Sequence, residues 1–250
     1  MGYENDLLSN LFSVIHEGGH GLYEINIKDE LLGTGLAEGA SMGIHESQSR
    51  FYENIISRSK EFLSVILPKI KELFPSLESI SLDDFYKAVN NVEPSLIRTE
   101  ADELTYSLHI IIRYKIEKKL IIGEIEVKDL PRIWKEKYIE YLGVEPKTDS
   151  EGILQDMHWS DGSFGYFPSY ALGNLYGGQF MNKMLQDNKD VFKNLKKTCD
   201  MTYINNWLSS NIHQFGAIYT PGELIKNVSG EELSSKYFLD YLNNKYKKIY

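Results

Sequence analysis

The stretch that decides how this 250-residue sequence is interpreted is VIHEGGHGLYE, at residues 14–24. It contains the pattern H-E-x-x-H, with His16 and His20 four positions apart. On a helix these two side chains lie on one face about one turn apart, so their imidazoles can hold one zinc ion between them. Glu17 then lies beside the metal without binding it, which is the position of a general base acting on a metal-bound water.

The residues around this pattern predict a helix. His16 and His20 lie at the border of its apolar stripe, where a cleft can open. Gly18, Gly19 and Gly21 each cost roughly 1 kcal/mol in a helix relative to alanine, so we expect this helix to need a close backbone approach. The alternative is a chance match on an ordinary amphipathic helix, expected in roughly one such chain in a hundred. The stripe, at spacings of three and four, consists of Leu8, Leu11, Phe12, Ile15, Gly19 and Leu22.

The two histidines predict a third metal ligand nearby, because zinc in peptidases takes three protein ligands and keeps an open position for water. A glycine-rich turn at residues 33–39 ends one element, and the next helix is expected to begin near Ser41. Glu46 on that helix is the best candidate, the alternative being a solvated glutamate. Its neighbour His45 faces another side of the helix, where it either supports the ligands or contacts substrate.

The composition excludes several classes of protein. Hydrophobic residues make up 42% and charged residues 25%, which is ordinary for a globular protein, and the net charge of −9 argues against a nucleic-acid partner. The most apolar run, residues 109–112, is far too short to span a membrane. The lone Cys199 excludes a disulfide framework and favours the reducing cytoplasm. Residues 1–6 are polar and acidic, which does not fit a signal peptide.

Helical periodicity over most of the chain predicts a mainly α fold with at most a small sheet near the site. We expect a break or a kink at Pro68 and allow a short strand at residues 94–97. No repeat or linker divides the chain, so a single domain is expected. The expected helices after Ser41 cover residues 51–73, 82–89, 104–120, 127–142, 168–185, 191–197, 201–215, 221–227 and 234–250.

Three further stretches carry candidate site residues. IRTEAD, residues 97–102, holds Arg98 four positions before Asp102, which fits either a surface ion pair or a guanidinium free to grip a substrate carboxylate. GILQDMHW, residues 152–159, combines an amide, a carboxylate, an imidazole and an indole, and could equally be a helical turn around a buried histidine. The loop before Pro168 is the kind of place where catalytic groups lie, and Tyr166 and Tyr170 flank that junction.

Four motifs in this order resemble those of the thermostable carboxypeptidase Taq family of metallocarboxypeptidases: HEGGH, HESQ, IRTEAD and GILQDMHW, which start at His16, His45, Ile97 and Gly152. The resemblance covers essentially the whole chain. Family members are about twice as long, and two of their upstream motifs, H-P-F and D-x-R-x-T, are absent here. The resemblance therefore implies that residues 1–250 are the C-terminal catalytic portion of such a peptidase, with the N-terminal half absent.

The resemblance also implies roles for individual residues in a helical, zincin-like fold with a long cleft. His16, His20 and Glu46 are the implied metal ligands and Glu17 the implied catalytic base. Tyr166 is the candidate for stabilising the oxyanion. The residues expected to contact substrate are Arg98, His45, Gln155, Asp156, His158 and Tyr170.

Together these features predict a carboxypeptidase that binds one divalent metal per chain and releases C-terminal residues one at a time from peptides with a free C-terminus. Arg98 is the expected grip on that carboxylate. Zinc is the expected metal, with cobalt or manganese as alternatives because family members use them, and a homodimer or a separate N-terminal half is the expected partner. Two alternatives stay open: a catalytically incomplete metal-binding module, and an endopeptidase with a cleft open at both ends.

Overall fold

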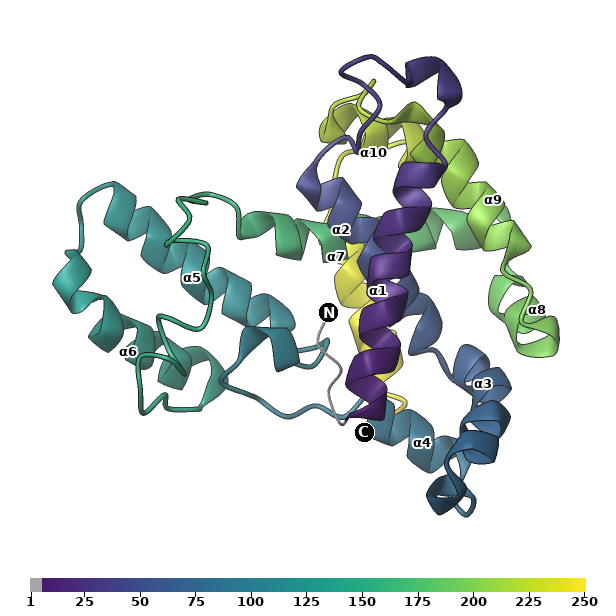
Figure 1. Ribbon diagram of the computed structural model, residues 1–250, viewed down its shortest axis with the longest axis horizontal. Helices are drawn as coiled ribbons and strands as arrows, with labels where there is room; N and C mark the ends of the chain where they lie inside the picture. Colours follow the sequence, from purple (N-terminus) through teal and green to yellow (C-terminus); the bar gives the residue numbers. More distant parts are fainter. Residues whose placement is uncertain (1–5) are drawn as a thin grey trace. The chain divides into compact units, whose positions relative to one another are not determined.

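The computed structural model describes residues 6–250, and every regular element among them is a helix (Figure 1). The prediction of a mainly α fold is confirmed. The small sheet is absent from the described residues, and residues 94–97 form a loop. None of the described helices is long and apolar enough to cross a membrane. The polar start of the chain, residues 1–5, lies outside the described residues.

The chain forms two compact units, and each is described by itself. The first contains the described residues up to Val89 together with Leu172–Tyr250, and the second is Asn90–Ala171. One boundary follows α4 (Leu82–Val89) directly and the other falls inside α7 (Pro168–Asp187). Neither boundary has a linker rich in proline or glycine, which is why periodicity and composition alone predict one domain.

The first unit is built on α1 (Leu7–Ile25), whose first turn is capped by Asp6. The Asp6 carboxylate accepts hydrogen bonds from the backbone N–H groups of Leu8 and Ser9 at 2.8 and 3.0 Å. Around α1 lie the other elements of this unit, which include α7 from Leu172 on. They are η1 (Asp29–Leu31), α2 (Met42–Arg50), η2 (Phe51–Ser57), α3 (Lys60–Leu73), η3 (Pro75–Leu77), α4, α8 (Val191–Thr198), α9 (Thr202–Asn211), η6 (His213–Phe215), α10 (Pro221–Ser229) and α11 (Lys236–Tyr246).

The apolar stripe predicted for α1 faces the core. Phe12 is buried at its centre, and Leu8, Leu11 and Ile15 are partly buried against the same cluster. That cluster is completed by side chains of α3 and α4: Leu63, Leu67, Ile70, Phe85 and Val89.

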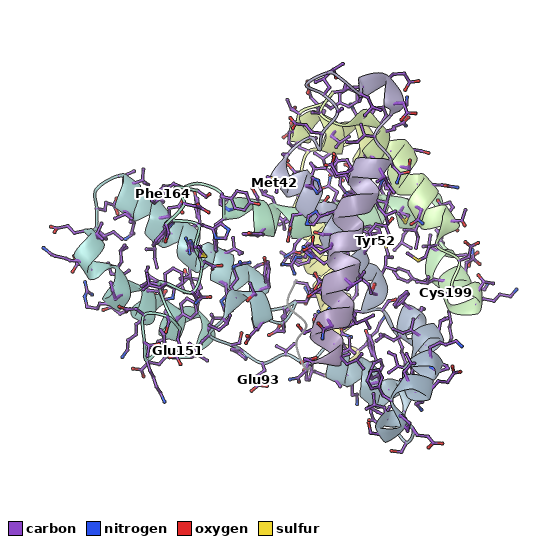
Figure 2. All side chains as sticks on the ribbon, in the orientation of Figure 1. Met42, Tyr52, Glu93, Glu151, Phe164 and Cys199 are labelled. Carbon is purple, nitrogen blue, oxygen red and sulfur yellow. The ribbon has the colours of Figure 1, made fainter. Side chains whose placement is uncertain are left out.

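The helix after α2 does not continue as the sequence predicts. Residues Phe51–Ser57 form a π-helical segment, a rare geometry that often occurs at functional sites. The chain breaks after it, at Ser59, whose hydroxyl caps α3 by accepting from the N–H of Phe62 at 3.2 Å. Pro68 lies inside α3, so the chain does not break there, and the alternative of a kink stays a prediction. Tyr52, labelled in Figure 2, ties this segment to α9 through a 2.8 Å hydrogen bond from its hydroxyl to Asn205.

The second unit is a pair of helices with an irregular segment packed against it. The helices α5 (Tyr106–Ile121) and α6 (Leu130–Leu142) lie side by side (Figure 1), and α6 ends at Gly143 in the left-handed conformation. Residues 148–166 form turns and not the helical turn that we had allowed for. Two short helices, η4 (Arg98–Glu100) and η5 (Val127–Asp129), complete the unit, and its main core cluster is Ile112, Ile116, Leu130, Trp134, Tyr138, Leu142 and Ile153.

Gly19 supplies the close approach expected of the glycines in α1. A Cβ atom on Gly19 would lie 2.7 Å from the Cα of Ser49 and 2.8 Å from the carbonyl oxygen of Gln48. Backbone cannot move away cheaply, so only glycine lets α1 and α2 pack this closely. At Gly18 and Gly21 an added Cβ would meet nothing within 4 Å.

We therefore expect Gly19→Ala and Gly18→Ala to change stability in opposite directions. Gly19→Ala should lower the free energy of unfolding by about 1–3 kcal/mol, because the methyl group forces α1 away from α2. Gly18→Ala, the matched control one position earlier, should raise it by up to about 1 kcal/mol, because alanine is the better helix former. Urea unfolding of the three proteins measures both values. Equal effects of the two substitutions would contradict this account of the helix contact.

Candidate active site

The packing of α1 on α2 brings the three predicted metal ligands together. Glu46 Oε2 lies 3.8 Å from His16 Nε2 and 3.7 Å from His20 Nε2. One donor atom from each of the three residues lies within 4.8 Å of the other two. Glu46 is buried, whereas the two imidazoles keep 20% and 22% of their surface exposed. The cluster therefore lies at the border of the core, as the position of the histidines beside the apolar stripe predicts.

The donor set fits a divalent metal. Tetrahedral zinc with ligands at 2.0–2.2 Å holds its donor atoms about 3.3 Å apart. The two separations from Glu46 Oε2 are about half an ångström longer, which side-chain rotations close. Two imidazole nitrogens and one carboxylate oxygen are also the donor types that zinc-type metals take in hydrolases.

His16 is held in place by Glu53, a residue of the π-helical segment. The Nδ1 atom of His16 lies 2.9 Å from Glu53 Oε2. Burial alone would raise the pKa of Glu53, but Arg50, the hydrogen bond from His16, and Arg58 together lower it to about 2. Glu53 is therefore a carboxylate that accepts the Nδ1 proton of His16 and leaves Nε2 as the donor for a metal.

His20 is held by a second chain of polar contacts. Its Nδ1 lies 2.6 Å from His45 Nδ1, and His45 Nε2 lies 2.7 Å from Glu24 Oε1. Because a carboxylate only accepts, His45 carries its proton on Nε2, and its Nδ1 accepts the proton of His20. Burial, with the nearby His16 and His45, lowers the pKa of His20 to about 4, so this imidazole is neutral near pH 7, as a ligand must be. Of the two roles considered for His45, these contacts favour support of the ligand.

Glu46 is oriented by its own helix and by α7. The Nε of Arg50 donates to Glu46 Oε1 at 2.9 Å, which leaves Oε2 for the histidines. On the other side, a Cβ atom on Gly173 would lie 2.6 Å from the Cγ of Glu46. A glycine at that point of α7 makes room for the carboxylate.

Glu17, the predicted general base, follows His16 directly on α1 and is exposed. It is close enough to His20 for its negative charge to oppose the lowering of the His20 pKa. An exposed carboxylate next to the cluster can accept and release protons. Its role as the base stays a prediction.

The other predicted site residues lie together in the second unit. The Arg98 guanidinium is buried and binds the Asp156 carboxylate, with Nε 3.2 and 3.1 Å from the two oxygens and Nη2 2.7 Å from Oδ1. Its Nη1 donates to the hydroxyl of Tyr106 at 3.2 Å. Burial would lower the pKa of Arg98, but the hydrogen bonds to Asp156 and the charge interactions with Asp156, Tyr106 and Tyr170 together raise the pKa above its ordinary value.

The alternative of an Arg98–Asp102 ion pair is wrong. The Asp102 carboxylate accepts from the backbone N–H groups of Leu104 and Thr105, both at 2.9 Å, and so holds the chain just before α5. The preference of aspartate for such positions outweighs the spacing of four, because residues 98–102 do not form a continuous helix on which the two side chains would meet.

Gln155 and His158 build the rest of this cluster. The Gln155 side chain accepts from the backbone N–H of Arg98 at 2.9 Å and donates to the carbonyl of Leu96 at 3.0 Å, so it fixes the backbone that carries Arg98. His158 Nε2 lies 3.0 Å from the Tyr170 hydroxyl. The Tyr166 ring packs on His158 and Tyr170, with centroids 5.4 and 5.3 Å apart. Direct contact of these residues with substrate, and the oxyanion role of Tyr166, stay predictions.

Sequence reasoning missed three residues. Glu24 lies one helical turn after His20, so helical spacing alone would have flagged it as a neighbour of the ligands. Glu53 reaches His16 from the π-helical segment, which the sequence pattern does not predict. Arg113 gives no such signal, because its partner Asp156 is far away in the sequence.

A helix that carries H-E-x-x-H and a glutamate from the following helix form a donor set that defines a class of metallopeptidases. The chain belongs to the carboxypeptidase Taq (M32) family of metallopeptidases, whose family model matches residues 2–246. This family implies a divalent metal. The resemblance drawn from the four motifs is confirmed.

Named relatives and solved structures agree with this assignment. The chain is 52% identical to carboxypeptidase 1 of Bacillus subtilis over 248 residues, which is 99% of this chain and 49% of the relative. It is 44% identical to thermostable carboxypeptidase 1 of Thermus thermophilus, over 99% of this chain and 48% of the relative. The crystal structure of the M32 carboxypeptidase from Deinococcus radiodurans superimposes with a TM-score of 0.96 at 38% identity, over 99% of this chain and 50% of that one. The chain thus spans about half the length of the relatives it matches.

Proposed function

We propose that this chain carries the catalytic centre of a metal-dependent carboxypeptidase that removes C-terminal residues from peptides. The observation that carries the proposal is the convergence of His16, His20 and Glu46, with the Nδ1 atom of each imidazole held by another side chain. Zinc is the proposed metal, and cobalt or manganese would suit the same donors. We also propose a cytoplasmic location, which the single cysteine, Cys199, supports.

The proposed chemistry is hydrolysis by an activated water. When bound at these ligands, a divalent metal acts as a Lewis acid that acidifies a water molecule and polarises a carbonyl oxygen. Glu17 takes the proton of the attacking water and returns it to the leaving amine. The hydroxyl of Tyr166 donates a hydrogen bond to the oxyanion that forms on the carbonyl.

Restriction to C-termini requires a cation that recognises a free carboxylate, and we assign this role to Arg98. A guanidinium binds a carboxylate with two parallel hydrogen bonds, and the buried Arg98 already holds the Asp156 carboxylate through Nε and Nη2. His158 and Tyr170 beside it are proposed to contact the end of the peptide.

We therefore expect peptides with a free C-terminus to be cleaved about 10–100-fold faster, in kcat/KM, than the same peptides as C-terminal amides, the value of one charge-assisted contact. Arg98→Lys should remove most of this difference, since an ammonium cannot reproduce the two-pronged grip. Arg132→Lys, an exposed arginine of α6, is the matched control and should keep it. Equal cleavage of acids and amides by the parent protein would favour the endopeptidase alternative.

The alternative of an incomplete module has an observation of its own. The chain spans about half the length of its relatives, and α1 presents an outward stripe of small and apolar residues beside the metal ligands. Val14 and Ile25 in this stripe are 61% and 76% exposed, and a Cβ atom added at Gly18 or Gly21 between them would meet nothing within 4 Å. Exposed apolar side chains that lie together on one face of a helix often mark a surface that another segment or protein covers. We propose that the half of the family protein not represented here, or a second copy of the chain, covers this stripe.

A further inference from the structure

Arg113 of α5 is the most unusual buried group in the second unit. It is fully buried, and its guanidinium stacks on the rings of Trp159 and Phe167, each 4.2 Å away. None of its three nitrogens has a hydrogen-bond partner among the described residues. The nearest carboxylate oxygen in an ion pair with it, Oδ2 of Asp156, lies 3.9 Å from its Nη1. Because buried charged donors without partners are costly, this arrangement indicates a partner in another state of the protein.

His158 places a second donor without a hydrogen-bond partner near the Asp156 carboxylate, in addition to Arg113. Its Nδ1 is buried without a hydrogen-bond partner among the described residues and lies 4.0 Å from Oδ1 of Asp156. Its Nε2 is placed to accept from the hydroxyl of Tyr170, 3.0 Å away, so Nδ1 is free to carry the proton. Each oxygen of Asp156 thus faces an unused donor at about 4 Å while the carboxylate is bound to Arg98 at 2.7–3.2 Å.

The charges favour an additional anion here. Asp156 balances only one of two buried guanidinium groups, Arg98 and Arg113. Glu117, one turn after Arg113, compensates in part, but its oxygens already accept from the indole N–H of Trp159 and the backbone N–H of Gly165. A second carboxylate at Arg98 would complete two ion pairs in place of one.

We propose that Asp156 is an internal placeholder for the C-terminal carboxylate of the peptide. The substrate carboxylate takes over Arg98, and Asp156 moves by about 1 Å to Arg113 and His158, which its present distances of 3.9 and 4.0 Å leave just out of reach. Because the exchange leaves no buried charge without a partner, it avoids the large free-energy cost of breaking a buried ion pair. A C-terminal amide cannot replace Asp156, because Arg98 would lose its counter-charge. The inference rests on the proposed role of Arg98 as the anchor.

Binding of a small carboxylate to the 250-residue protein tests the exchange without requiring catalysis. The probes are N-acetylphenylalanine and its amide, titrated by nuclear magnetic resonance with the guanidinium Nε–H signals of Arg98 and Arg113 as reporters. Asp156→Asn should tighten binding of the acid by about tenfold or more, because the competitor is removed and the site gains one positive charge. Arg113→Gln should weaken binding of the acid by about tenfold or more, because the displaced Asp156 carboxylate then has no cation to pair with.

The sign of the Asp156→Asn effect separates this exchange from a static site. Weaker binding in Asp156→Asn would show that Asp156 only positions Arg98, and unchanged binding in both variants would also overturn the proposal. The double variant should bind like Asp156→Asn alone, and additive losses would contradict the exchange. In the parent protein the acid should shift the Arg113 signal as well as that of Arg98. A shift of Arg98 alone would overturn the exchange, even where a variant fails to fold.

A failure of the anchor itself is recognised separately. If the parent protein binds neither probe, or binds acid and amide equally, Arg98 is not a carboxylate anchor and the placeholder falls with it. The proposed metal centre in the first unit would be untouched by that result, because it is measured by metal content.

Discussion

Replacing Glu17 by glutamine is expected to lower whatever peptide turnover the protein has, alone or with the unmatched half of the family protein supplied, by about 10²–10⁴-fold while the bound metal stays in place. The amide keeps the size and shape of the side chain but cannot accept the proton of the attacking water. Glu17 is exposed and is not one of the three clustered donors, so neither the fold nor the metal should depend on it. Turnover of a free-acid peptide and the metal content of the same preparation give the two readings.

Glu30→Gln, at an exposed glutamate of η1, is the control for this substitution and should leave turnover within about threefold of the parent. A Glu17→Gln protein within about threefold of the parent would show that another group is the base.

The second large effect is expected from supplying the part of the family protein that this chain does not match. We expect the chain alone to be a weak enzyme or an inactive one, and addition of the unmatched half of the Bacillus subtilis relative to raise kcat/KM by about 10²-fold or more. The metal and Glu17 can still act on water, but a substrate held by half a cleft loses positioning that can be worth roughly 7–11 kcal/mol. Light scattering should show association of the two parts.

The exposed stripe of α1 offers a control for this experiment. Ile25→Lys places a charge on the stripe and should weaken both association and the gain in activity. Ile122→Lys, at an apolar residue of the second unit that is 59% exposed, should leave both unchanged. A monomer with full carboxypeptidase activity unaided, and no response to the added half, would show that these 250 residues are a whole enzyme.

Local sequence signals predicted most of the helices and the clustering of the three candidate metal ligands. Helix α2 begins after Ser41 and α7 begins at Pro168, as the preferences of serine and proline for helix starts predict. Helix α6 ends at Gly143, as the preference of glycine for helix ends predicts. This clustering was predictable because the spacing of His16 and His20 is set within one helix, and Glu46 lies on the next one.

Long-range pairing could not be predicted in the same way. Arg98 binds Asp156, which is 58 positions away, and not Asp102, which is four away, because the turn between residues 98 and 102 takes Asp102 to the start of α5. The contact of Glu53 with His16 depends on a π-helical segment that no pattern in the sequence announces. Contacts between residues far apart in the sequence depend on tertiary packing, which the pattern of a single sequence does not predict.

The measurement that tests the account most directly is the metal content of the purified chain and of Glu46→Ala, determined by elemental analysis after incubation with zinc, cobalt or manganese. We expect about one metal per chain in the parent and in the control Glu30→Ala, because three converging donors define a single site. In Glu46→Ala the metal content should fall to about a tenth or less, since two imidazoles alone hold the ion weakly. A parent protein that takes up no metal, or a Glu46→Ala protein that keeps it all, would contradict the proposed centre.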